Sequence, residues 1–133
     1  MANKLYKSFK SALLSGVNFD WANDTFKVGL IESGDYAFDE NHQFLSDVPA
    51  VLLEANLTAV SQVENSVGAN PVSVANSLFG RTVSSLILYR DSGDPATSEL
   101  IAFFDTGAGL PLFLQGSDVS INWPESGARI FTL

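Results

Sequence analysis

Beyond residue 16, the chain is a succession of short segments in which apolar and polar residues alternate, separated by turns rich in glycine, proline and aspartate. Successive side chains of a β-strand point to opposite faces, so this alternation is typical of strands with one buried face. The segments that fit the pattern are 25–31, 50–60, 83–90, 100–104, 119–123 and 129–133. Two hairpins and several spaced strands predict a mainly β chain, an antiparallel β-sandwich or jelly-roll-like domain with a short N-terminal helix.

Three of these segments carry the most specific local predictions. In 25–31, Phe26, Val28 and Leu30 fall on one face, which we expect to be buried. Segments 83–90 and 100–104 flank a turn in which Gly93 is free to adopt a positive φ. We therefore expect residues 83–105 to form a hairpin with a long loop.

The stretches between them are less regular. Residues 33–49 are polar with interspersed aromatic residues, and we interpret them as a long loop pinned by Tyr36, Phe38 and Phe44. Residues 61–80 are rich in serine, asparagine, valine and glycine, which indicates an extended, weakly specified stretch. In the predicted strand 50–60, the residues expected to share one face are Leu53, Ala55, Leu57 and Ala59.

Residues 3–15 are predicted to form the only helix, with Asn3 capping its start and Gly16 just past its end. Its apolar face would comprise Leu5, Phe9, Ala12 and Leu13, at the spacing i, i+4, i+7 and i+8.

Length and composition favour one globular domain, 1–133, with the β-sandwich spanning 25–133. Apolar residues make up 46% of the sequence, enough for a real core. The chain contains no cysteine, which excludes disulfides, thiolate metal sites and cysteine nucleophiles.

Charge is strongly segregated along the chain. The net charge is −8, yet Lys4, Lys7 and Lys10 precede every acidic residue. The rest holds four basic residues against all fifteen acids, so it would repel nucleic acid and anionic membranes. No segment approaches the roughly 20 apolar residues of a membrane span, and no signal peptide is evident. We expect synthesis in the cytoplasm.

The sequence Phe103-Phe104-Asp105-Thr106-Gly107 is a possible catalytic motif, because an apolar pair before Asp-Thr-Gly marks aspartic proteases. That family places the motif near the start of the chain, whereas here it lies near the end. We interpret Asp105 as a residue of the turn 106–111 that follows a strand. A glycan hydrolase would need two carboxylates facing one cleft, which a sequence cannot reveal.

Two further features of the polar loop could carry chemistry. His42, the single histidine, could be a general base or a metal ligand, but it has no spaced partner, and we favour an exposed loop residue. The acidic residues Asp35, Asp39, Glu40 and Asp47 could bind Ca²⁺, but they lack EF-hand spacing and favour a solvated loop. We predict no cofactor, no metal site and no catalytic residues.

The basic side of the N-terminal helix is the remaining candidate for a partner contact. The hypothesis is that it meets an acidic partner surface through Lys4, Leu5, Lys7, Phe9 and Lys10. The same apolar residues could instead pack the helix on its own domain, leaving solvated lysines, and both interpretations can hold.

Several motifs, in order along nearly the whole chain, resemble small virion proteins of tailed bacteriophages. They are Met-Ala-Asn followed by Tyr6, Asp20-Trp21, Asp24-Thr25-Phe26-Lys27-Val28, Gln43-Phe44-Leu45-Ser46-Asp47-Val48-Pro49, Ile87-Leu88-Tyr89-Arg90-Asp91, Leu100-Ile101-Ala102-Phe103-Phe104-Asp105, Thr106 to Pro111, Ser120-Ile121-Asn122-Trp123 and Ile130-Phe131-Thr132-Leu133. The match is weakest over residues 61–82.

The resemblance implies a virion structural protein and no enzyme. Fold and size are similar to those of capsid cement (decoration) proteins, which bind the major capsid protein shell and stabilise it. Such a protein is expected to form a dimer or trimer on the particle. The alternative is a tail, head–tail adaptor or fibre-associated protein of the same particle.

Overall fold

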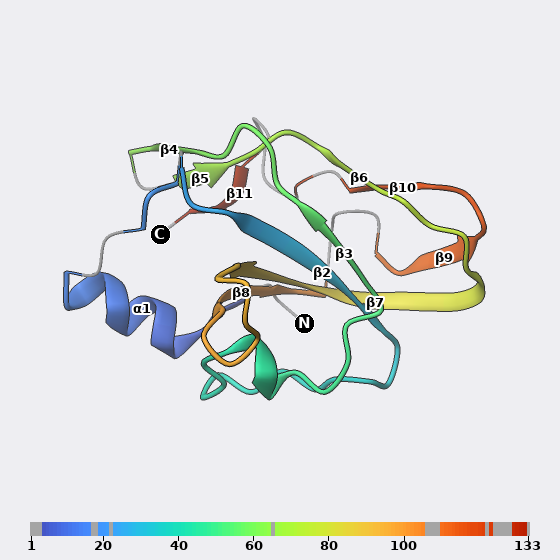
Figure 1. Cartoon of the computed structure of the whole chain (residues 1–133), viewed down its shortest axis with the longest axis horizontal. Helices are drawn as coiled ribbons and strands as arrows, with labels where there is room; N and C mark the ends of the chain where they lie inside the picture. Colours follow the sequence, from blue (N-terminus) through green and yellow to red (C-terminus); the bar gives the residue numbers. More distant parts are fainter. Residues whose placement is uncertain are drawn as a thin grey trace.

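The computed structural model describes residues 4–16, 19–21, 23–64, 66–105, 110–121, 123 and 129–132. Antiparallel strands dominate it, with one short helix near the N-terminus, which confirms the predicted fold class (Figure 1). The elements are β1 (Lys4–Leu5), α1 (Lys7–Leu14), β2 (Phe26–Glu32), a 3₁₀ turn η1 (Leu45–Asp47), β3 (Leu53–Asn56), β4 (Ser61–Val63), β5 (Ser66–Gly68), β6 (Val72–Val74), β7 (Phe79–Arg90), β8 (Glu99–Phe104), β9 (Leu112–Gln115), β10 (Val119–Ile121) and β11 (Arg129–Thr132).

The main sheet has the strand order β1-β8-β7-β2-β3, and β9 pairs with the first part of β7. Strands β7 and β8 form the predicted hairpin, with Leu86 opposite Phe104 and Arg90 opposite Glu99. Gly93 lies in the intervening loop at φ +89°, a conformation that glycine adopts without steric cost. The long strand β7 therefore organises the sheet, since β2, β8 and β9 all pair with it.

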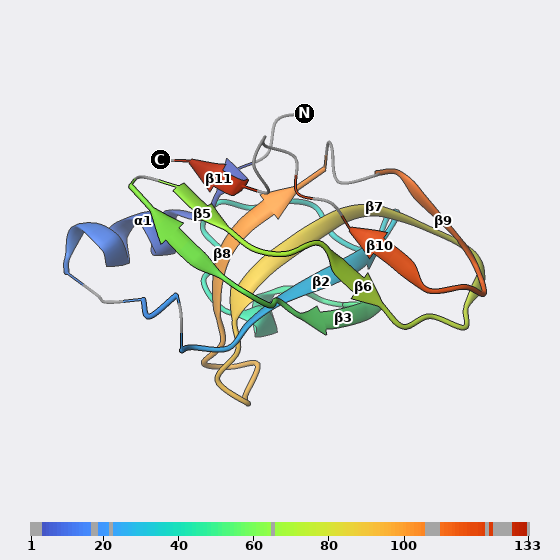
Figure 2. The same cartoon turned by 90° about the horizontal axis from the view of Figure 1, so that it is seen from above.

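A second layer covers one face of this sheet. It consists of the pair β6–β10 and the three strands β4, β5 and β11, which lie together over the main sheet (Figures 1 and 2). The core between the layers holds Val28 and Leu88 from the main sheet and Val74 and Ile121 from the second layer. Trp123 belongs to the same core, and its Nε1–H donates to the carbonyl oxygen of Asn70 at 3.0 Å.

The loop 33–49 covers part of the other face of the main sheet. There Ile87 and Tyr89 of β7 form a second apolar cluster with buried Tyr6, and Tyr36 and Phe38 of the loop pack against it. The predicted pinning is thus confirmed for Tyr36 and Phe38, whereas Phe44 forms an isolated backbone bridge with Glu99. Because the loop packs here, β2 is buried on both faces rather than on the single predicted face.

The helix is shorter than predicted. It begins at Lys7, while Lys4 and Leu5 form β1 and pair with Phe103 and Ala102 of β8. The helix prediction is wrong for these residues, because pairing with a sheet edge satisfies backbone groups that would lie unbonded in a first helical turn. Asn3 lies outside the described residues, and no side chain caps the helix at Tyr6. Gly16, at φ +86°, follows the helix end as expected.

Strand boundaries also differ from the predictions. The strand predicted over 50–60 covers only β3, because the chain turns at Ala59, which has φ +53°. Residues 61–80, predicted as weakly specified, instead supply β4, β5, β6 and the first residues of β7. Residues 106–109 of the predicted turn 106–111 lie outside the described residues.

Candidate binding hollow on the outer face of the main sheet

A hollow of about 450 Å³ lies on the outer face of the main sheet, beside the loop 33–49. Four separate segments build it: β1, the loop, the middle of β7 and the end of β8. Its lining residues are Lys4, Tyr36, Phe38, Ser84, Ser85, Phe103 and Asp105. Aromatic rings therefore meet a lysine, a carboxylate and two serines in one depression, an arrangement suited to holding a polar group of a partner against an apolar wall.

Strand pairing places the polar residues of the hollow. Lys4 stands opposite Phe103 in the β1–β8 pair, and Asp105 follows directly after β8. Ser84 falls at an irregularity of β7, because Ile31 pairs with Ser85 while the next residue, Glu32, pairs with Val83. The extra residue at this bulge re-aims the strand next to the hollow.

A chain of hydrogen bonds runs from the interior to the edge of the hollow. The hydroxyls of Tyr6 and Tyr36 lie 2.9 Å apart, and the Tyr36 hydroxyl lies 2.8 Å from Nδ1 of His42. The arrangement that gives each hydroxyl an acceptor has Tyr6 donating to Tyr36 and Tyr36 donating to an unprotonated Nδ1. The Nε2–H of His42 then points toward Asp39 Oδ2 at 3.8 Å.

Burial raises the pKa of the two tyrosines in this series of hydrogen bonds. Tyr6 is fully buried, and this burial, with the hydrogen bond to Tyr36, raises the pKa of its hydroxyl far above the ordinary value. Burial also raises the pKa of Tyr36. Both hydroxyls are therefore neutral hydrogen-bond donors at physiological pH. The hydrogen bonds that link Tyr6, Tyr36 and His42 hold the loop in position.

The structure corrects the interpretation of His42 as an exposed residue. Its side chain is 28% exposed and packs against the Tyr36 ring, with the ring centroids 5.6 Å apart. Asp47 accepts backbone N–H groups from Gln43 and Phe44 at 2.9 and 3.1 Å, and these bonds lower the pKa of its carboxyl. These side chains thus hold the loop in shape.

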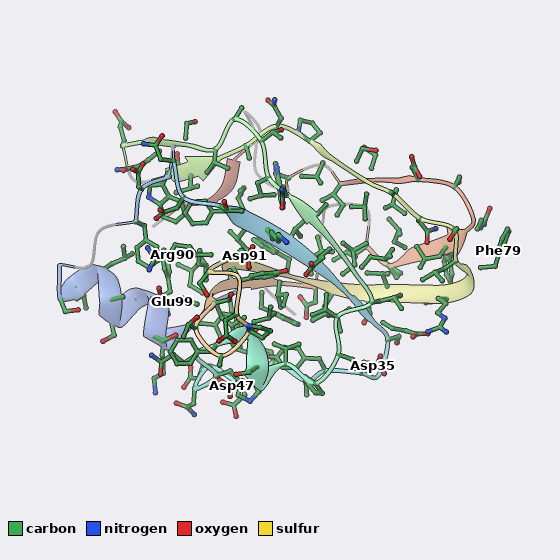
Figure 3. All side chains as sticks on the ribbon, in the orientation of Figure 1. Asp35, Asp47, Phe79, Arg90, Asp91 and Glu99 are labelled. Carbon is green, nitrogen blue, oxygen red and sulfur yellow. The ribbon has the colours of Figure 1, made fainter. Side chains whose placement is uncertain are left out.

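The loop acids form no metal centre in the structure. Among the described residues, no group of three or more histidine or acidic side chains is placed to hold a metal ion. Asp35 and Asp47 lie apart along the loop (Figure 3). Asp105 lines the hollow next to the β8 end, but Thr106 and Gly107 of the protease-like motif lie outside the described residues.

The five residues proposed for partner contact divide into two groups. Phe9 is 2% exposed and belongs to the core, where its ring contacts Phe19, and Leu5 is half-buried. Neither is free for a partner in the way the sequence suggested, because Phe9 of α1 and Leu5 of β1 both pack against the chain's own core. Lys4, Lys7 and Lys10 are exposed.

Two of these lysines also have contacts within the chain. The Lys4 ammonium lies 5.4 Å from the centroid of the Phe38 ring, a cation–π geometry. Lys7 lies 3.4 Å from Glu40, with both side chains more than half exposed. An ion pair this exposed contributes little to stability and leaves the lysine able to change partners.

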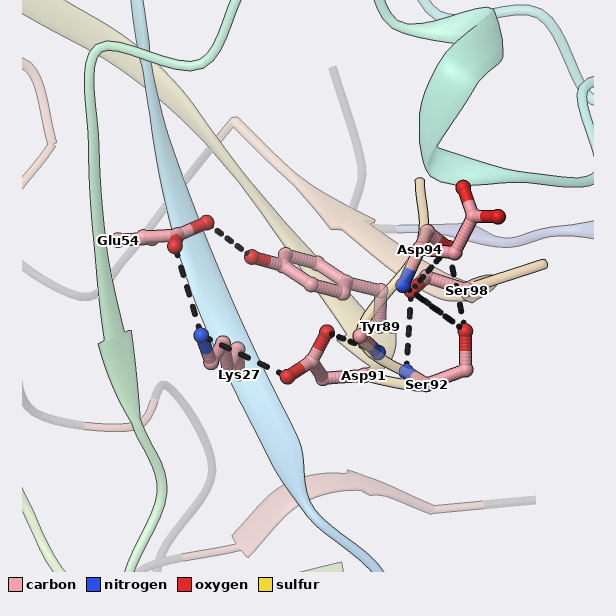
Figure 4. A network of polar contacts seen from close by, with 8 residues as sticks. Lys27, Glu54, Tyr89, Asp91, Ser92, Asp94 and Ser98 are labelled. Carbon is pink, nitrogen blue, oxygen red and sulfur yellow. Dashed lines mark hydrogen bonds and ion pairs between the residues drawn. The ribbon is translucent and has the colours of Figure 1, made fainter. Parts of the chain in front are cut away.

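Other charged side chains fasten the strands together. Lys27 lies 3.4 Å from Glu54 and 3.6 Å from Asp91, and Tyr89 donates to Glu54 at 2.5 Å (Figure 4). Arg90 forms ion pairs with Asp24 and with Glu99. These groups link neighbouring strands and so contribute to holding the fold together.

Exposed aromatic residues are a feature that the sequence analysis missed. Phe79 is 73% exposed and Phe113 is 68% exposed, on the paired strands β7 and β9. Phe79 points away from the body of the molecule (Figure 3). The signal in the sequence is the uncharged stretch 110–117, Leu-Pro-Leu-Phe-Leu-Gln-Gly-Ser, which is unusual for a surface strand.

Comparison of the chain with protein-family models finds no match, and comparison with curated proteins finds none either. The resemblance to phage virion proteins therefore stays a prediction. In the described part of the chain, no helix combines the length and apolar character needed to cross a bilayer.

Proposed function

We propose that this chain is a structural subunit of a tailed-phage particle, and that it acts as a cement protein on the major capsid protein shell. The observation that carries the proposal is the segregation of charge. Lys4, Lys7 and Lys10 are exposed at the N-terminal end of a chain whose remaining sequence is strongly acidic. Such a surface fits an acidic patch on a neighbouring protein.

The hollow extends this contact surface. Lys4 belongs both to the lysine group and to the wall of the hollow, where Phe38 and Phe103 provide apolar area. A side chain of the shell protein that entered the hollow would meet rings and a positive charge together. Contacts made only with the assembled shell add binding free energy to that state alone, which is how a cement protein stabilises a particle.

The first test is the copy number of the chain in purified particles, measured by quantitative mass spectrometry against the major capsid protein. We expect a ratio approaching whole-shell stoichiometry. A few copies per particle would instead indicate a tail, adaptor or fibre-associated protein, and absence from particles would refute a virion role.

The second test concerns the lysines. Replacing Lys4, Lys7 and Lys10 together with glutamate should abolish binding to shells that lack the protein, because it reverses the positive charge. The matched replacement with arginine should preserve binding, because it keeps that charge. Circular dichroism confirms the fold of both variants. Equal shell binding by the two variants would contradict the proposed contact.

A further inference from the structure

Strand β9 leaves one edge of the main sheet open. Val83 of β7 pairs with Leu112 of β9 and also with Glu32 of β2, so β9 and β2 lie on opposite sides of β7. No described strand pairs with the other side of β9. In Figure 2 this strand runs along the border of the molecule. Its outward N–H and C=O groups can therefore accept a further strand.

This four-residue edge lacks two of the features that normally prevent strand addition, charged side chains and proline, and the β7–β9 pair contains a bulge between Phe79 and Arg81 of β7. Natural edge strands carry charged side chains, prolines or bulges. Residues 112–115, Leu-Phe-Leu-Gln, contain neither a charge nor a proline, and their pairing with β7 is regular from Leu112 to Leu114. The nearest acid that follows β9 in the sequence is Asp118.

The two exposed rings lie on one face of the same ribbon. Gln115 stands opposite Phe79, and Phe113 lies two residues before Gln115 on β9, so Phe79 and Phe113 share the outer face. The Phe79 ring lies against Gly116, where a Cβ would come within 2.3 Å of it. Phe79 and Phe113 thus place two exposed rings on one face of the β7–β9 ribbon, with Phe113 on the edge strand itself.

Hydrogen bonds to residues 76–78 hold the turn that follows β9. The N–H of Gly116 donates to the carbonyl oxygen of Leu78 at 2.8 Å, and the Asn76 side chain donates to the carbonyl oxygen of Ser117 at 3.1 Å. Asn76 also receives support from Asp118, which accepts its N–H at 3.2 Å. The edge is therefore held in strand geometry before any partner arrives, which lowers the entropic cost of adding a strand.

We propose that two copies of this chain associate by antiparallel pairing of their β9 strands about a two-fold axis at Phe113. When the two-fold axis is normal to the sheet, the outer faces of both copies lie on the same side. Residues that stand opposite each other must then be both odd-numbered or both even-numbered. Centring the pair on Phe113 places the two Phe113 rings side by side. It also sets Leu112 opposite Leu114 of the second copy on the inner face. The inference does not depend on the proposed virion role.

The association is tested by the mass of the purified chain in sedimentation equilibrium over a range of concentrations. We expect twice the 14.3 kDa chain mass at high concentration. Phe113→Lys should raise the dimer dissociation constant at least about tenfold. Leu14→Lys is the matched control, since Leu14 is 90% exposed on α1, far from β9. A wild-type chain that stays monomeric, or equal dissociation by both variants, overturns the proposal.

The register is tested by cross-linking, because the native chain has no cysteine. Directly opposite residues of antiparallel strands have Cα atoms about 4.5–5.5 Å apart, within the range of a disulfide. Phe113→Cys should therefore give a covalent dimer on mild oxidation, and Gln115→Cys should not. Cross-linking of Gln115→Cys as fast as Phe113→Cys would overturn the proposed axis.

Discussion

The hydrogen-bond chain from Tyr6 to His42 makes an asymmetric prediction about stability. Tyr6→Phe removes a hydroxyl at the buried end, and Tyr36 keeps its bond to His42 Nδ1. The free energy of unfolding should fall by about 0.5–1.5 kcal/mol, the net contribution of one hydrogen bond. Tyr36→Phe should cost more, about 1–3 kcal/mol, because the buried Tyr6 hydroxyl then loses its acceptor.

The double variant separates these contributions. Once Tyr36 is phenylalanine, removing the Tyr6 hydroxyl relieves an unsatisfied buried group rather than breaking a bond. The second substitution should therefore cost nothing further or restore some stability, giving a coupling energy of about 1 kcal/mol or more. Two residues that acted independently would give additive losses.

Urea unfolding of the wild type, the two single variants and the double variant measures these differences. Fluorescence of Trp21 and Trp123 together with circular dichroism reports the transition, and equal slopes against urea show that the unfolded states are comparable. Our reasoning is refuted if Tyr6→Phe is at least as destabilising as Tyr36→Phe, or if the double variant equals the sum of the single ones.

Phe9→Ala should lower the free energy of unfolding by about 3–5 kcal/mol in urea titrations, since Phe9 is buried in the core; a loss below about 1 kcal/mol would contradict that placement. Because the folded pKa of Asp47 is lowered, its stabilising effect is present at neutral pH and is lost as pH falls below about 4. Acid titration should therefore show a steeper loss for the wild type than for Asp47→Asn. Burial raises the pKa of Tyr6 and Tyr89, so stability should fall as pH rises above about 10, where only the unfolded state ionises; Tyr89→Phe should flatten this decline, and an unchanged slope would argue against it.

Features that depend only on neighbouring residues could be predicted from the sequence. Alternation identified Phe26, Val28 and Leu30 as a buried strand face, and all three are buried. The turn residues around Gly93 placed the β7–β8 hairpin, because a positive φ is a local property of the backbone. The aromatic residues of the loop 33–49 marked it as packed, since large rings in a polar stretch need an apolar surface.

Features that depend on distant strands could not be predicted in this way, because they arise only when the chain folds. Lys4 and Leu5 fit a helical face in sequence, yet they pair with β8, which is almost 100 residues away in the chain. Strands β10 and β11 pair with β6 and β5 rather than with each other. The hollow and the open edge of β9 also arise only when separate segments meet. Period-two alternation specifies that a segment is a strand and which face is apolar, but it does not specify the partner strand, because backbone hydrogen bonds are the same for every sequence.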